Sequence, residues 1–120
     1  MDIQKFKVGT LAYGFSRSRS NYGCITPIEI VKVGRKYVTV AGGTQYMEAP
    51  NGHYLMDKDN LDFHPLLFLT RQEANEYKES KELLEYIRAH HYAISEYSLP
   101  VLRDIATAMK RGDEERKNRT

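Results

Sequence analysis

The hydrophobic pattern changes its period at Thr70, and this change constrains the fold more than any other feature of the chain. Before Thr70, short segments alternate between apolar and polar residues and are separated by turn residues, which is typical of β-strands. After Thr70, a long charged run carries its apolar residues at helical spacing. The pattern predicts an α+β protein in which a small β domain is followed by helices.

Tight turns divide residues 1–69 into short strands. Gly34 and Arg35 separate two alternating runs and predict a hairpin, and Asn51-Gly52 supplies the positive φ of a second hairpin turn. Pro27 cannot donate to a ladder, so its strand is expected to lie at an edge or to contain a bulge. Five or six strands are expected, within residues 6–13, 24–33, 36–40, 44–48, 53–56 and 63–69.

Strands this short, without a helix between them, indicate a small antiparallel β-barrel or a strongly curved sheet over residues 1–69. Closure into a barrel would also remove exposed strand edges. Among small barrels the pattern is most similar to the Src-homology-three type, with a long first loop between Tyr13 and Gly23.

Two amphipathic helices are expected after the barrel. Residues 70–73, Thr-Arg-Gln-Glu, form a capping box and predict a helix that begins at about Arg71. Ser98 can cap a second helix, with Pro100 in its first turn and Gly112 at its end. A brief connector predicts an antiparallel hairpin over residues 70–112, packed on or beside the barrel, and residues 113–120 are expected to form a frayed charged tail.

No enzyme is expected, because the residues that catalysis or metal binding needs do not gather in the sequence. Nothing around Cys24, the lone cysteine, resembles a nucleophile motif. His90 and His91 project about 100° apart on a helix and cannot easily share a metal ion. Residues 57–62 are rich in oxygen ligands but lack the glycine and glutamate of a calcium loop, which favours a solvated turn. We therefore expect no catalytic residue, metal or cofactor.

Composition favours a soluble protein of the cytoplasm. The longest apolar run, Leu66–Leu69, is too short to span a bilayer, and residues 1–5 lack the pattern of a signal peptide. A single cysteine suits a reducing compartment. The net charge is only +2, with eight Lys/Arg against six Asp/Glu in residues 1–69 and ten of each in residues 70–120. Nucleic-acid binding would therefore have to rest on local clusters.

Cationic and aromatic residues gather in two places that could bind a partner. The first loop interleaves rings with guanidinium groups, and the adjacent hairpin tip is basic, so that both could contact phosphates, bases or an acidic protein surface. The alternatives are a solvated loop and, for most tyrosines, core packing; Tyr46 and Tyr54 are expected among the exposed ones. The candidate partner-binding residues are Tyr13, Phe15, Arg17, Arg19, Tyr22, Lys32, Arg35, Lys36, Tyr46 and Tyr54.

The helical half resembles a pattern of small phage and prophage proteins. It is carried by residues 67–74 (Leu-Phe-Leu-Thr-Arg-Gln-Glu-Ala), by residues 81–84 with Ile87-Arg88, and by residues 97–99 with Leu102-Arg103. In such proteins the pattern is similar to a capped helical hairpin after a small barrel. Because phage accessory proteins of this size commonly bind a larger machine, the resemblance implies an inhibitor or adaptor, including inhibitors of host defence nucleases.

Three functions remain open from the sequence. The first is recognition of a host or phage protein that itself handles nucleic acid, through the Arg17 and Arg19 loop and exposed tyrosines. The second is direct binding of nucleic acid by the barrel, with cations at phosphates and rings at bases. The third is homodimer formation through the apolar faces of the helical hairpin.

Overall fold

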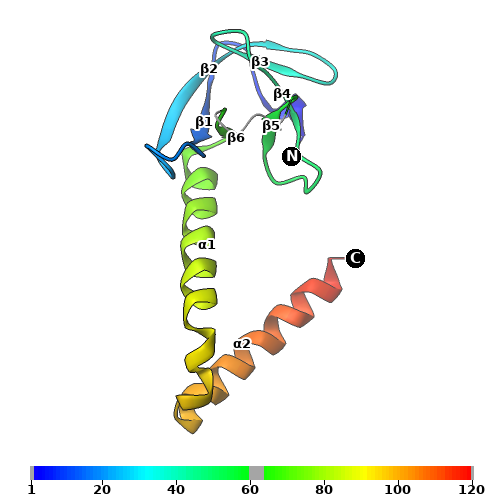
Figure 1. Ribbon diagram of the computed structural model, residues 1–120. Helices are drawn as coiled ribbons and strands as arrows, with labels where there is room; N and C mark the ends of the chain where they lie inside the picture. The colour runs from blue at the N-terminus through cyan, green and yellow to red at the C-terminus, as the bar shows by residue number, and fades with distance from the viewer. Residues whose placement is uncertain (1, 60–63, 120) are drawn as a thin grey trace. The chain divides into compact units, whose positions relative to one another are not determined.

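A closed antiparallel β-barrel forms the first part of the protein, as Figure 1 shows for the computed structural model, which describes residues 2–59 and 64–119. A short 3-10 helix, Ile3–Lys5, precedes the barrel. The strands are β1 (Leu11–Phe15), β2 (Ile25–Val33), β3 (Val38–Val40), β4 (Gln45–Glu48), β5 (Leu55–Asp57) and β6 (Leu66–Phe68). The predicted α+β fold with a small antiparallel barrel is confirmed. Residues 60–63, which belong to the expected polar connection and last strand, lie outside the described residues.

The barrel closes through a ladder between its first and last strands. β1 pairs with β6 in the register Tyr13 to Phe68 and Phe15 to Leu66. Pro27 lies opposite Tyr13 in the half of β2 that pairs with β1, whereas the ladder to β3 begins at Ile30. That half of β2 is locally an open edge, where a missing donor costs little. The register shift comes later, between Ile30 and Lys32, and not at Pro27.

Alternation along the strands fills the barrel with apolar side chains. Most of the barrel core lies within one hydrophobic cluster, and each large aliphatic or Phe side chain that is fully buried contributes about 1.5–3 kcal/mol. The predicted turn at Asn51-Gly52 is confirmed, since Gly52 has φ of +74°. The buried members of this cluster are Ile3, Phe6, Ala12, Ile30, Val38, Val40, Tyr46, Leu55 and Leu67.

The helix α1 (Arg71–His90) begins where the capping box predicts. The Thr70 hydroxyl oxygen accepts a hydrogen bond from the backbone N–H of Glu73 at 3.1 Å, which satisfies one free donor of the first turn. Ala74 is fully buried beside Phe68, in a second hydrophobic cluster against which Tyr77 packs. The first turns of α1 therefore cover the barrel, and the protein divides into two compact units within α1, after Glu82.

The second unit contains the end of α1, a 3-10 helix (His91–Glu96) and the helix α2 (Leu99–Asn118). The prediction that the second helix ends at Gly112 and leaves a frayed tail is wrong. A glycine inside a helix costs about 1 kcal/mol. Ion pairs one turn apart, Arg116 with Asp113 at 2.7 Å and Lys117 with Glu114 at 3.9 Å, offset part of this cost. None of the described helices combines the length and apolar character needed to cross a membrane. Antiparallel packing of the two helices stays a prediction.

Candidate functional site

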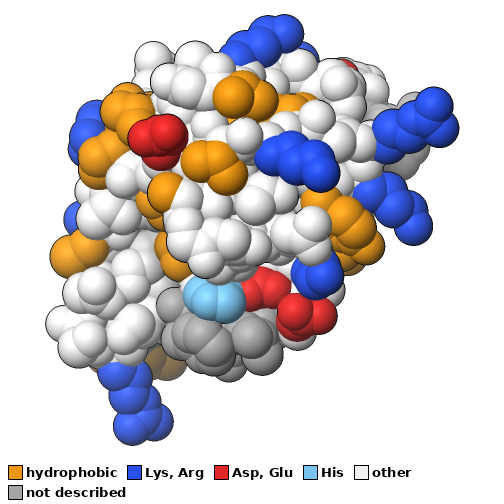
Figure 2. Space-filling view, turned by 90° about the horizontal axis from the view of Figure 1, so that it is seen from above, with side chains coloured by type: hydrophobic (Ala, Val, Ile, Leu, Met, Phe, Trp, Pro, Cys, Tyr) orange, Lys and Arg blue, Asp and Glu red, His pale blue; other side chains and the backbone are white. Residues whose placement is uncertain are grey.

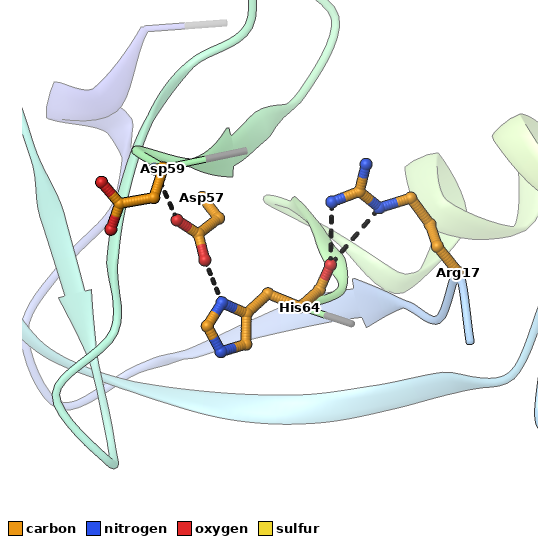
Figure 3. A network of polar contacts seen from close by, with 4 residues as sticks. All are labelled: Arg17, Asp57, Asp59 and His64. Carbon is orange, nitrogen blue, oxygen red and sulfur yellow. Dashed lines mark hydrogen bonds and ion pairs between the residues drawn. The ribbon is translucent and has the colours of Figure 1, made fainter. Parts of the chain in front are cut away.

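A buried carboxylate and a histidine join the two ends of the connection between β5 and β6 (Figure 3). Asp57, the last residue of β5, is only 2% exposed, and its carboxylate contacts Nδ1 of His64, just before β6. The backbone N–H of Asp59 donates to the same carboxylate at 2.7 Å. Arg17, which follows β1, donates to the carbonyl oxygen of His64 from Nη2 at 3.0 Å and from Nε at 3.3 Å. The network therefore ties the ends of β1, β5 and β6 together.

The surroundings of Asp57 act on its pKa in opposite directions. Burial acts to raise it, but the hydrogen bonds from His64 and the Asp59 amide, with the nearby charges of His64 and Arg17, hold the pKa of the carboxyl below its usual value. Burial raises the pKa of the neighbouring Tyr46 hydroxyl to about 12, and the Asp57 charge adds to the rise. Both groups are thus held in one protonation state at neutral pH.

Because of this depressed pKa, we expect Asp57 to make the stability fall at low pH. A carboxyl whose pKa is lower in the folded protein stabilises it above the unfolded pKa of about 3.9, and this contribution is lost as the pH falls through the folded pKa. The free energy of unfolding should therefore decrease below about pH 4, and less steeply in Asp57→Asn than in the wild type. Urea unfolding over the acid range measures both slopes, and parallel curves would contradict the assignment.

Sequence reasoning missed this network. The sequence predicts a solvated turn over residues 57–62 and gives no role to His64. The signal that could have identified it is the alternation of β5, which places Leu55 and Asp57 on the same buried face. Of the predicted turn, residues 60–62 lie outside the described residues. Within residues 2–59 and 64–119, no three side chains of the metal-binding types gather to hold an ion.

Four of the predicted partner-binding residues make contacts within the fold. Phe15 and Tyr46 are each 1% exposed, so the expectations that Phe15 stacks on a base and that Tyr46 is exposed are wrong. Tyr46 packs in the barrel core, whereas Phe15 lies on the same side of β1 as Tyr13 and is covered by Tyr77 of α1. Tyr54 is half-buried against Phe68, with ring centres 5.7 Å apart. Arg17 is half-buried in the network described above.

The first loop is tied at its base and carries its remaining candidates outward. The backbone N–H of Ser16 donates to the Cys24 carbonyl at 3.0 Å, and the N–H of Gly23 donates to the Ser16 carbonyl at 2.9 Å. Arg19 is exposed, and Tyr22 is 61% exposed while its ring packs nearly perpendicular to that of Phe15. This loop is therefore a closed turn structure that displays one cation and one ring.

The other cationic candidates lie on the hairpin between β2 and β3. Lys32, Arg35 and Lys36 are all exposed. Tyr13 is half-buried, and its ring already makes a cation–π contact within the chain, since the Arg71 guanidinium lies 4.9 Å from the ring centre. Figure 2 shows Lys and Arg side chains standing out at separate points around one face of the barrel, and not as one continuous strip.

Exposed apolar side chains concentrate in the second unit. Neither α2 nor the 3-10 helix before it has a buried residue, and the one buried residue of α1 is Ala74 in the first unit. Large apolar side chains remain accessible along these helices, which is unusual for a surface that only faces water. They are Leu83, Leu84, Tyr86, Ile87, Tyr92, Leu99, Val101 and Met109.

One family matches the chain over almost all of its length. The Phage ProQ C-terminal-like domain matches residues 1–116, which include the barrel and both helices. The comparisons with curated proteins and with solved structures gave no match.

Proposed function

This chain belongs to the family of phage ProQ C-terminal-like domains, and we propose that it is a non-catalytic recognition protein whose target is a larger protein that handles nucleic acid. By binding, it would inhibit or adapt that machine, of which a host defence nuclease is one example. The observation that carries the proposal is the row of exposed apolar side chains between Leu83 and Met109. A protein surface is the ligand that such side chains suit best.

The distribution of charge supports a protein partner over a nucleic acid for these helices. Residues 70–120 carry ten cationic and ten acidic side chains, so they offer no excess of positive charge to a phosphate backbone. Apolar contact area, by contrast, contributes about 25 cal/mol for each Å² removed from water.

Affinity capture with matched variants tests the proposal. Ile87 and Val8 are both large, apolar and about equally exposed, at 60% and 62%, but Ile87 lies on α1 in the second unit and Val8 lies on the barrel. From host lysate, the wild type and Val8→Glu should retain the same protein, whereas Ile87→Glu should retain about tenfold less of it. Circular dichroism checks that both variants are folded. Equal capture by all three proteins, or capture of nothing, would count against the proposal.

Direct binding of nucleic acid by the barrel is the second candidate. Its support is the exposure of Arg19, Lys32, Arg35 and Lys36 on the loop and hairpin of the barrel. For each phosphate that these cations neutralise, log K should fall by about 0.9 for each unit of log salt concentration. The charge reversals Lys32→Glu and Lys36→Glu should weaken binding, while Lys110→Glu on α2 should not. An affinity for labelled single-stranded RNA or DNA that does not change with salt would exclude this mode.

A second copy of the chain could cover the same helical side chains as a host protein would. Sedimentation distinguishes the two, because a homodimer should dissociate on dilution and the Ile87→Glu variant should be monomeric at every concentration. A wild-type protein that is monomeric at high concentration would remove this alternative and leave the apolar side chains for a different partner.

A further inference from the structure

A row of polar side chains crosses the outer face of the barrel from β2 to the end of β5. Lys32 of β2 lies opposite Thr39 of β3, and Thr39 lies opposite Gln45 of β4. The backbone N–H of Lys58, which follows β5, donates to the carbonyl oxygen of Gln45 at 3.0 Å. Residues that lie opposite each other in an antiparallel ladder project from the same face. This face is the outer one, because the residues on either side of Thr39 are buried in the core.

A lysine stands at each end of this row, and both lysines are exposed. Nζ of Lys58 lies 5.7 Å from the ring centre of Tyr37, which shares the outer face with Thr39 because the two are two residues apart. The side chain of Lys58 is thus directed across the outer face of the sheet. None of the ion pairs between described residues involves Lys32 or Lys58. Both ammonium groups can therefore bind an external anion.

The spacing of the two lysines suits carboxylates on an extended peptide. Neighbouring strands lie about 4.8 Å apart, so the three steps from β2 to β5 separate the ends of the row by about 14 Å along the sheet. An extended chain rises about 3.3 Å for each residue, so side chains four residues apart lie about 13 Å apart and on the same face. Thr39 and Gln45, between the lysines, supply a hydroxyl and an amide for hydrogen bonds.

Two features of this face favour the carboxylates of a protein over a nucleic acid. Bases stack on aromatic rings, but the Tyr37 ring is half-buried and already has the Lys58 ammonium over it. Glu48, three residues after Gln45, and Asp59, next to Lys58, are exposed and would repel a continuous chain of phosphates. A peptide with only two acidic side chains, placed at the lysines, avoids most of this repulsion.

We propose that this row, which consists of Lys32, Thr39, Gln45 and Lys58, binds an extended acidic segment of a protein, with one carboxylate at each lysine. The inference rests on the proposed function for the source of the segment, which is the bound protein. The row is then a polar contact surface on the barrel, in addition to the apolar contact surface of the helices.

Two probes of equal charge test the row on the full chain. The peptide acetyl-Glu-Thr-Val-Thr-Glu-amide carries carboxylates four residues apart, and a thymidine trinucleotide carries the same charge on its phosphodiesters. In an NMR titration at physiological salt, the peptide should shift the backbone amide signals of Thr39, Gln45 and Lys58. Lys32→Gln should weaken peptide binding about threefold, and the double variant Lys32→Gln with Lys58→Gln about tenfold, because each exposed ion pair contributes modestly. Lys32→Arg, which keeps the charge, and Lys110→Gln, at an exposed position on α2, should bind as the wild type does.

The outcomes separate this inference from the proposed function. Absence of shifts with the peptide, or equal affinity in the double variant and the wild type, would overturn the row even if Ile87→Glu abolishes partner capture. Equal binding of the same peptide with glutamine at both acidic positions would overturn it as well. If the same residues bind the trinucleotide as tightly as the peptide or more tightly, a protein segment is not the ligand. The substituted lysines are exposed, so the variants should fold, and circular dichroism checks this.

Discussion

Asp57→Ala is expected to lower the free energy of unfolding by about 3 kcal/mol. Removing a buried, hydrogen-bonded carboxylate typically costs about 1–3 kcal/mol, because the groups that donated to it lose a charged acceptor. The upper end applies here because Asp57 is only 2% exposed. The variant also leaves the backbone N–H of Asp59 without its acceptor. Unfolding in urea, followed by circular dichroism at neutral pH, measures the change.

Asp59→Ala is the matched control for this experiment. The side chain of Asp59 is exposed, and only its backbone N–H takes part in the network. We expect it to change the free energy of unfolding by less than about 0.5 kcal/mol. If the two alanine variants are equally stable, the Asp57 contacts do not hold the loops of the barrel together.

Phe15→Ala should have the second large effect, a loss of about 3–5 kcal/mol. Phe15 is 1% exposed, and its ring lies edge-on to Tyr77 of α1 with 5.0 Å between the ring centres. The truncation therefore opens a void where the helix packs on the barrel, and the surrounding strands cannot close it. Unfolding in urea measures the loss, and hydrogen exchange should show that the first turns of α1 open more readily.

Tyr22→Ala is the matched control, because it truncates an exposed ring that packs on the buried ring of Phe15. The Tyr22 ring is nearly perpendicular to the same Phe15 ring, with 5.4 Å between the ring centres, but Tyr22 is 61% exposed. Its truncation should cost less than about 1 kcal/mol. Equal losses in the two variants would mean that Phe15 is not part of the core that joins α1 to the barrel.

Local patterns predicted the elements that depend on neighbouring residues. Asn51-Gly52 indicated its turn because the left-handed backbone at Gly52 is a property of that dipeptide. Thr70 indicated the start of α1 because its hydroxyl and the Glu73 amide are three residues apart. Gly112 does not end α2, which continues to Asn118. A single glycine costs a helix only about 1 kcal/mol, so it ends the helix only where the residues after it do not continue it.

The candidate partner-binding residues show that side chains close together in the sequence can be separated by the fold. The sequence grouped Phe15, Arg17 and Arg19 because they are close in the chain, but β1 ends at Phe15 and the two arginines lie in the loop that follows it. Phe15 entered the core, Arg17 bonded to the carbonyl of His64, and Arg19 remained at the surface. A cluster in the sequence is therefore divided as soon as the strand and the following loop adopt their backbone conformation.

The sequence by itself determined the class of the protein, namely alternating strands up to Thr70 and helices after it, because period and turn chemistry act over a few residues. Only the tertiary structure decided which side chains meet. Closure of β1 on β6 brings Arg17 to the backbone carbonyl of His64, and packing of α1 on the barrel covers Phe15 with Tyr77. These contacts depend on the burial of residues that are distant in the chain, and no local pattern records that burial.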